Sequence, residues 1–295
     1  MTLENCLVIG ISSRALFDLD EENEIYETQG LDAYTAYQLE HENEILKPGS
    51  GFALVKALLK LNERYQRHIV EVLIMSRNSA DTSLRIFNSI AHYGLDISRA
   101  VLTGGASLSP YLSSFGVDLF LSANEEDVKK SIQDGFAAGR IYTNAIQGYD
   151  PLSDIDQIRI AFDGDAVLFS DEAEQIYQKQ GLEAFVLHEQ KNACQQLPKG
   201  PFARFLKTIS DLQKTMDVKE PAIRTALVTA RNAPAHERVI RTLRSWDVRI
   251  DEAFFLGGLS KTEVLKAFGP HIFFDDQKKH ADHASTVVPS AQVPW

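Results

Sequence analysis

The chain has 295 residues, of which 44% are hydrophobic and 24% charged, a composition typical of globular proteins with one large or two medium domains. Its formal net charge of −11 argues against non-specific nucleic-acid binding, because that binding depends on basic side chains that neutralise phosphates. The two cysteines, Cys6 and Cys194, lack zinc-ligand spacing and imply no disulfide framework. We expect a cytoplasmic protein with no secretory signal and no membrane partner, because no basic region precedes an apolar run and no segment approaches about 18 apolar residues.

An internal repeat is visible when residues 20–34 are aligned with residues 171–185. Eight of these 15 positions are identical, at a constant offset of 151. The match continues downstream with small changes of offset, for example Phe52 with Phe202, Gly104 with Gly257, and Leu119 with Ile272. Because the register persists with few gaps, we interpret the chain as a tandem duplication.

The duplication predicts two units. The first covers residues 1–145 and the second residues 155–295, with a turn-rich join near residues 139–157. The second unit is expected to be catalytic and to contain a small cap insert at about residues 171–216.

Each unit shows the same order of predicted elements. Short apolar strands are expected at residues 7–11, 70–75, 101–102 and 119–121, and again at 158–162, 226–228, 254–256 and 272–274. Helices are expected between them, as over residues 235–246, where Val239, Ile240 and Leu243 share one face. Strands that alternate with helices predict an α/β fold, a Rossmann-like parallel sheet with flanking helices that binds ligands at the carboxyl ends of its strands.

Acidic residues follow two predicted strands of the second unit. Asp163 and Asp165 come directly after residues 158–162, and Asp275 and Asp276 follow residues 272–274. Carboxylates held close together either raise a pKa or require a cation, and Mg²⁺ prefers oxygen ligands. Alone, the first pair also fits a turn with solvated aspartates, and the second a helix start.

Thr229 and Lys261 lie at comparable places in the chain. Thr229 follows the strand at 226–228, where a hydroxyl can hold a phosphate oxygen or act as a helix N-cap. Lys261 comes three residues after Gly258 near a helix start, and alone it would be interpreted as a solvated lysine. The four sites occur in order at strand ends or the following helices, which favours one common site.

This order resembles the haloacid dehalogenase-like phosphatases, with DxD, Ser/Thr, Lys and paired Asp as four successive motifs. The segments FDGDAVLFSDE, LVTARNAP, FFLGGLSK and HIFFDDQ are similar, more closely, to the cytosolic 5′-nucleotidase type I family, and the likeness covers most of the chain. The resemblance implies a haloacid dehalogenase-like fold and Mg²⁺-dependent hydrolysis of nucleoside 5′-monophosphates, with AMP as the suggested substrate.

The resemblance also implies a role for each residue. Asp163 would be the nucleophile that forms an aspartyl-phosphate, and Asp165 the general acid and base. Thr229 and Lys261 would stabilise charge on the phosphoryl oxygens. The ligands of Mg²⁺ would be Asp163, Asp165 through its backbone carbonyl, Asp275 and Asp276.

The predicted cap would set substrate specificity. His188 and Glu189 could contact the ribose or base, and Arg231 could reach the phosphate or form a surface salt bridge. Tyr177 and Phe185 could stack on a base or pack in the core of the cap. Three basic residues at helical spacing predict a solvated face: Arg238, Arg241 and Arg244.

The first unit lacks the acidic residues, so we expect it to be catalytically silent. In the repeat register Ser12 and Arg14 replace Asp163 and Asp165, and only the hydroxyl at Ser76 is kept. The other catalytic positions fall on Leu108, Ser122 and Ala123. Asp18 and Asp20 look like a DxD motif, but they lie outside that register and fit a charged helix start.

Two alternatives to a nucleotidase remain open. One is a phosphatase of the same fold that acts on another small phosphate monoester. The other is a non-catalytic nucleotide-binding protein, which would leave the acidic residues without a use. The chain could also form a homo-oligomer, on which the sequence is silent.

Overall fold

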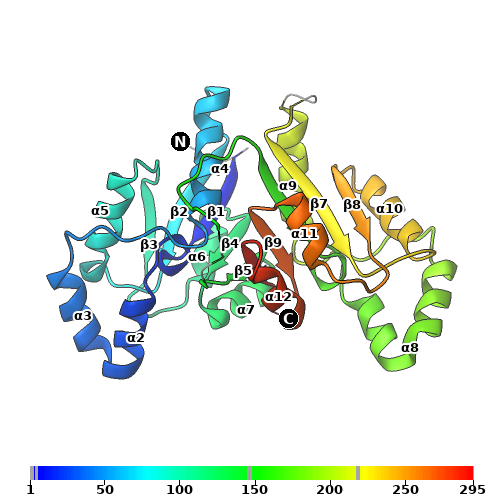
Figure 1. The fold of residues 1–295 in the computed structure, drawn as a ribbon, viewed down its shortest axis with the longest axis horizontal. Helices are drawn as coiled ribbons and strands as arrows, with labels where there is room; N and C mark the ends of the chain where they lie inside the picture. The colour runs from blue at the N-terminus through cyan, green and yellow to red at the C-terminus, as the bar shows by residue number, and fades with distance from the viewer. Residues whose placement is uncertain (1–2, 4–5, 145, 147, 217–219, 295) are drawn as a thin grey trace.

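The computed structural model describes residues 3, 6–144, 146, 148–216 and 220–294, and its centre is one ten-stranded sheet (Figure 1). The first half of the chain supplies β1 (Leu7–Ile11), β2 (Val70–Ser76), β3 (Arg99–Leu102), β4 (Leu119–Ser122) and β5 (Ala138–Ile141). The second half supplies β6 (Ile158–Phe162), β7 (Ile223–Thr229), β8 (Glu252–Phe255), β9 (Ile272–Asp275) and β10 (Ser290–Gln292). The strand order is β3-β2-β1-β4-β5-β10-β9-β6-β7-β8.

The sheet is parallel except at its middle, where β5 and β10 pair in antiparallel fashion. The predicted α/β class with flanking helices is therefore confirmed, with one antiparallel pair that the sequence did not indicate. Both strands of this pair were missed, because AGRI and SAQ contain no apolar run. β5 also occupies part of the region, from residue 139 onward, in which a turn-rich join was expected.

The two halves pair their strands in matching registers. Leu7 faces Val70 and Ile158 faces Ile223, and these partners differ by the offsets of 151 and 153 found in the sequence. The strand order runs outward in both directions from β1 and β4 in one half, and from β6 and β9 in the other. Such reversal points create a crevice at the carboxyl ends of parallel strands, where ligands commonly bind.

Helices cover both faces of the sheet. The first half contributes α1 (Ser13–Leu16), α2 (Asp20–Gln29), α3 (Leu31–Glu40), η1 (Asp81–Ser83), α4 (Phe52–Tyr65), α5 (Leu84–His92), α6 (Ser109–Ser114) and α7 (Glu125–Gln133). The second half contributes η2 (Gly164–Leu168), α8 (Glu172–Lys191), α9 (Ala203–Lys214), α10 (His236–Ser245), α11 (Thr262–Phe268) and α12 (Lys278–Ser285). In Figure 1, α4 and α9 rise from the upper side of the sheet, and α7 and α12 lie below its middle.

A helical hairpin projects from each half, at the lower left and lower right of Figure 1. Helices α2 and α3 meet at Gly30 with φ +86°, and α8 folds back on itself at Gly181 with φ +82°. Glycine adopts this positive φ without the steric cost of a side chain. The insert predicted at residues 171–216 is thus a hairpin only as far as Lys191, since α9 packs against the sheet through buried residues that include Phe205.

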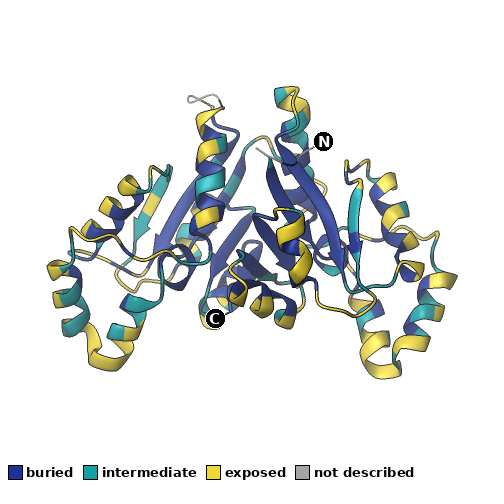
Figure 2. Cartoon of the chain, turned by 180° about the vertical axis from the view of Figure 1, so that it is seen from behind, coloured by how far each residue is buried: buried dark blue, intermediate teal, exposed yellow. Residues whose placement is uncertain are grey.

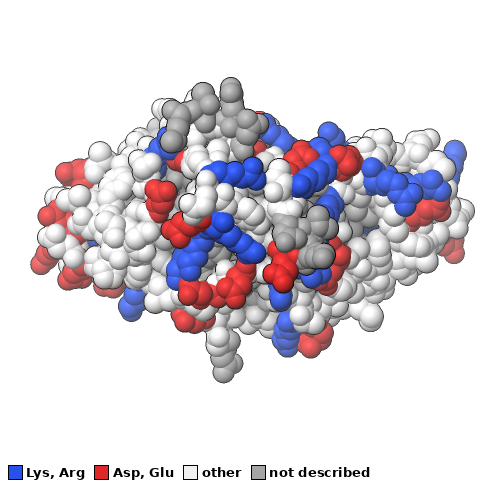
Figure 3. Space-filling model, turned by 90° about the horizontal axis from the view of Figure 1, so that it is seen from above, with Lys and Arg blue, Asp and Glu red and all other residues white. Residues whose placement is uncertain are grey.

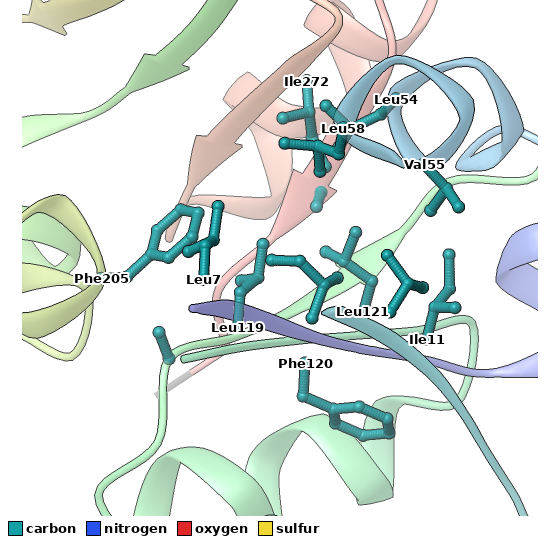
Figure 4. Close-up of a cluster of buried hydrophobic side chains, with 14 of the residues drawn as sticks. Leu7, Ile11, Leu54, Val55, Leu58, Leu119, Phe120, Leu121, Phe205 and Ile272 are labelled. Carbon is teal, nitrogen blue, oxygen red and sulfur yellow. The ribbon is translucent and has the colours of Figure 1, made fainter. Parts of the chain in front are cut away.

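The two halves share one hydrophobic core (Figure 4). Leu54 and Leu58 of α4, in the first half, lie beside Ile272 of β9, in the second. Phe205 of α9 lies beside Leu7 of β1, so α4 and α9 each pack against a strand of the other half. Figure 2 shows the buried sheet between helices whose outer faces are exposed, as expected for a sheet covered on both faces.

Charged side chains of α4 hold the segment that joins the halves. Lys56 and Lys60 both pair with Asp154, and Arg64 donates to the carbonyl oxygen of Asp156. The face seen from above carries basic and acidic side chains close together (Figure 3). Within the described part of the chain, no helix combines the length and the apolar character that crossing a bilayer demands.

Because Leu58 contributes to packing against the other half, Leu58→Ala should destabilise the whole molecule. We expect the free energy of unfolding to fall by about 2–5 kcal/mol, the usual cost of a buried Leu→Ala change. Urea unfolding followed by circular dichroism and by tryptophan fluorescence measures this, since both tryptophans, Trp246 and Trp295, belong to the second half. Leu31→Ala at an exposed hairpin position is the control, and a fluorescence midpoint unmoved by Leu58→Ala would contradict the shared core.

Candidate active site

Three carboxylates meet at the carboxyl edge of the second half of the sheet. Asp163 follows β6, and Asp275 and Asp276 lie at the end of β9, the strand that pairs with β6. One oxygen from each lies within 4.8 Å of the other two. Asp163 and Asp275 are buried and Asp276 is half-buried. Neighbouring parallel strands therefore bring together residues that are more than 100 positions apart in the sequence.

Lys261 connects two of these carboxylates. It precedes α11, and its Nζ lies 2.8 Å from Asp163 Oδ1 and 2.7 Å from Asp275 Oδ2. Burial by itself would lower the pKa of the ammonium, but the adjoining Asp163 and Asp275 raise that pKa and keep the group charged. The lysine is buried, contrary to the simpler interpretation of a solvated side chain.

Lys261 alone cannot offset the charge of the acidic cluster when all three carboxyl groups are ionised. Burial raises the pKa of Asp163 to about 6, with Asp275 and Asp165 adding to the effect of burial. Burial and the carboxylates of Asp163 and Asp275 raise the pKa of Asp276 to about 8, and burial also raises the pKa of Asp275. Such crowded oxygen donors fit a hard divalent cation, which would relieve their repulsion.

The short turn η2 directly follows Asp163, and non-helical backbone interrupts it, because Asp165 is extended with φ −69° and ψ 141°. It contains five residues, whereas the first half has the four-residue helix α1 at this place. Ala166 adopts φ +59°, a left-handed conformation that is uncommon outside glycine. This interrupted turn carries Asp165 past the end of the strand.

Thr229 ends β7 beside this turn. Its Oγ1 accepts a hydrogen bond of 3.2 Å from the N–H of Arg231. A side chain at Gly164 would place its Cβ only 3.2 Å from the same oxygen, so the glycine allows the close approach. Helix α10 has its N-cap at Ala235, so Thr229 is not the N-cap of that helix.

The carboxylate of Asp165 points to Arg231 rather than into the acidic cluster. Nε of Arg231 donates to Asp165 Oδ2 at 2.8 Å, and Nη2 donates to Oδ1 at 2.7 Å. We predicted that Asp165 contacts the metal through its backbone carbonyl, and the side-chain bonds to Arg231 do not test that prediction. Arg231 is buried, so it does not form the surface salt bridge that the sequence allowed.

Glu189 and Arg238 extend this ion network. Glu189 Oε2 lies 2.5 Å from Arg231 Nη1, and its Oε1 accepts from Arg238 Nη1 at 2.8 Å. Both oxygens are buried and bonded, so Glu189 does not offer them to a ribose or base here. The prediction of a solvated Arg238 was wrong, because its guanidinium closes this network, whereas Arg241 is exposed.

The other predicted substrate contacts lie on the hairpin of α8. His188 is partly exposed, and its Nε2 lies 3.4 Å from Arg238 Nη1 and 4.0 Å from Glu172. Tyr177 and Phe185 form an edge-to-face pair at 6.4 Å, but Tyr177 is 48% exposed and so does not lie in a core of the cap. Phe185 also lies under the Arg231 guanidinium, 5.5 Å from ring centre to Cζ.

Two residues near the site were not identified from the sequence. Arg238 was assigned to a solvated face, although a comparison of the halves pairs it with the buried Arg85. His280 on α12 has Nδ1 3.7 Å from Asp275 Oδ2. Its position in the first turn of the helix after the paired aspartates was the only available signal.

The corresponding place in the first half is built from hydroxyl groups. Ser13 Oγ lies 3.1 Å from Ser76 Oγ, and Arg14 pairs with Asp20 at 3.0 Å. Among the described residues, the acidic side chains close enough to bind one metal together are Asp163, Asp275 and Asp276, all in the second half. Asp18, the other residue of the apparent DxD motif, is exposed and outside that group.

Comparison with known proteins identifies relatives. The family described as 5′-nucleotidase matches residues 1–295. A human protein named cytosolic 5′-nucleotidase 1B is 40% identical over 292 residues, which cover 95% of this chain. The chain spans about half, 47%, of the length of that relative. No solved structure matched the chain. The family resemblance noted in the motifs is thereby confirmed, and this chain belongs to the 5′-nucleotidase family.

Proposed function

We propose that this chain is a Mg²⁺-dependent 5′-nucleotidase that converts nucleoside 5′-monophosphates, AMP among them, to nucleoside and phosphate. The observation that carries the proposal is the convergence of Asp163, Asp275, Asp276 and Lys261 in a chain of the 5′-nucleotidase family. Acidic groups gathered around a nucleophile with a buried lysine suit phosphoryl transfer, which depends mostly on positioning and charge stabilisation.

The proposed chemistry proceeds in two displacements. A carboxylate oxygen of Asp163 attacks phosphorus, the bond from phosphorus to O5′ breaks, and Asp165 gives a proton to the leaving oxygen. Water then attacks the aspartyl-phosphate, Asp165 takes a proton from that water, and phosphate leaves while the Asp163 carboxylate is restored. Lys261 and Thr229 supply hydrogen bonds to the phosphoryl oxygens in both displacements.

The side chains of Asp163, Asp275 and Asp276, with the backbone carbonyl of Asp165, would hold Mg²⁺. A bound cation supplies positive charge beside the phosphoryl oxygens and offsets the repulsion among the carboxylates. The raised pKa values of Asp163 and Asp276 support this assignment, because those carboxylates lack sufficient compensating charge in the protein itself.

The proposal extends to the organisation of the molecule. We place a catalytic haloacid dehalogenase-like unit at residues 155–295 and a silent, duplicated unit at residues 1–145. Matching strand registers and paired hairpins support this origin. The name of the human relative supports a cytoplasmic location.

Mg²⁺ should stabilise the protein through the acidic cluster. At 100 times its dissociation constant, a ligand of the native state adds about 2.7 kcal/mol to the unfolding free energy, so the melting temperature should rise. Asp276→Asn should remove most of that rise, as measured by calorimetry with and without MgCl₂. Asp18→Asn, in the apparent DxD motif of the first half, is the control and should respond like the wild type. An equal response of Asp276→Asn would place the cation elsewhere.

Asp163→Asn should abolish measurable turnover, because no carboxylate would remain to form the covalent intermediate. We would measure phosphate release from nucleoside monophosphates and sugar phosphates, with and without Mg²⁺. We expect wild-type activity on the nucleotides and none from the variant. Equal turnover of sugar phosphates would argue for a general monoester phosphatase, and no release from any monoester would argue for a binding protein.

A further inference from the structure

A chain of alternating charges runs from the site into the hairpin of α8. Its members, in order of contact, are Asp165, Arg231, Glu189 and Arg238. The side chains of Arg231, Glu189 and Arg238 are at most 4% exposed, and the side chain of Asp165 is 18% exposed. Such buried charges are costly to desolvate, and a packed neutral set is often at least as stable. Their presence therefore needs a reason beyond stability.

The first half provides an internal comparison. Gln38 stands where the second half has Glu189, and Asn78 where it has Arg231. The surrounding frame is the same in both halves: Nε of Arg85 donates to the carbonyl oxygen of Glu44, as Nε of Arg238 donates to that of Gln195.

The first half builds the same frame without the central charged pair. Gln38 is buried and donates from Nε2 to the hydroxyl of Tyr34, which occupies the place of Phe185. Arg85 pairs with Glu22 at 2.6 Å instead, and Glu22 occupies the place of Ala173. Neutral amides thus fill the position, although Gln38 Oε1 is buried without a hydrogen-bond partner among the described residues, and the charged pair occurs in the half that has Asp165.

We propose that Arg231 is a positioning residue that holds the Asp165 carboxylate, and that Glu189 fixes Arg231 for this task. The assignment rests on the proposed function, and the two bonds fit the ionised Asp165, the form that takes a proton from the attacking water. Two parallel N–H···O bonds set the direction of a carboxylate better than one, and a bidentate arginine provides them. The second carboxylate, Glu189, keeps the guanidinium in its plane from the opposite side.

The contacts of Arg231 favour positioning over direct phosphate binding. Nε and Nη2 are engaged by Asp165 and Nη1 by Glu189, while the ring of Phe185 covers the guanidinium. Arg231 acts through Asp165, so its loss should lower kcat and leave KM nearly unchanged. Because Glu189 belongs to α8, the hairpin contributes to catalysis through this contact.

The test copies the neutral arrangement of the first half into the second. The variant combines Arg231→Asn and Glu189→Gln with Phe185→Tyr and Ala173→Glu, which supply the partners seen around Gln38 and Arg85. With Mg²⁺ and AMP, we expect cooperative unfolding, KM within about 3-fold of wild type, and kcat reduced about 10²- to 10⁴-fold, the usual contribution of a general acid or base. A wild-type kcat, or a raised KM with unchanged kcat, would overturn the proposal.

A double-mutant cycle separates positioning from general damage. In an Asp165→Asn background, the same four substitutions should change the residual turnover by less than about 3-fold, because the group they position is already lost. A further loss as large as in the wild type would overturn the proposal. Glu22→Gln, which removes the buried Arg85 pair of the first half, is the matched control and should cost stability without lowering kcat.

Arg231→Lys provides a second test if the four-residue variant does not fold. It keeps the charge beside Glu189 but cannot make two parallel bonds to Asp165. We expect a lower kcat with KM unchanged, and a wild-type kcat would overturn the proposal. Wild-type turnover is measured first: an inactive wild type contradicts the proposed function itself, whereas an active wild type with active variants contradicts only the assignment of Arg231.

Discussion

The site depends on the charge balance among Asp163, Asp275, Asp276 and Lys261. One buried ammonium lies between two carboxylates, and the third carboxyl group is so close that one lysine cannot offset the charge of all three when they are ionised. Placing such groups together is unfavourable unless the fold fixes them and a cation or phosphoryl ligand completes the balance. The rigid strand ends of β6 and β9 provide that fixation.

The rest of the molecule supports this edge of the sheet. β9 is held by β6 on one side and by β10 on the other, and β10 in turn pairs with β5 of the first half. Leu54 and Leu58 of α4 pack beside Ile272, at the start of the strand that ends in Asp275. The first half, whatever its own chemistry, is therefore part of the support on which the acidic cluster rests.

A comparison of the halves separates residues that the shared fold requires from residues that the candidate active site requires. Both halves keep the hairpin glycine, at Gly30 and Gly181. Both also keep an arginine, Arg85 or Arg238, that donates to a carbonyl oxygen in the loop after the hairpin. The second half has the carboxylates, Lys261 and the charged pair of Glu189 and Arg231, and the first half has other residues at these positions. The shared features therefore describe the common scaffold, and these differences in chemistry lie at the carboxyl edge of the second half.

The sequence alone determined the α/β class, the bounds of β1 and β6, the repeat register and the residues of the acidic cluster, because these depend on apolar runs, strand ends and motifs. It did not reveal β5 and β10, whose short polar-containing segments become strands only through pairing with neighbours. It also placed Arg238 in solvent, because helical spacing cannot show which face meets a hairpin folded back at Gly181. The union of two halves into one sheet, and the partner chosen by each buried charge, were decided by tertiary structure because they depend on contacts between residues far apart in the chain.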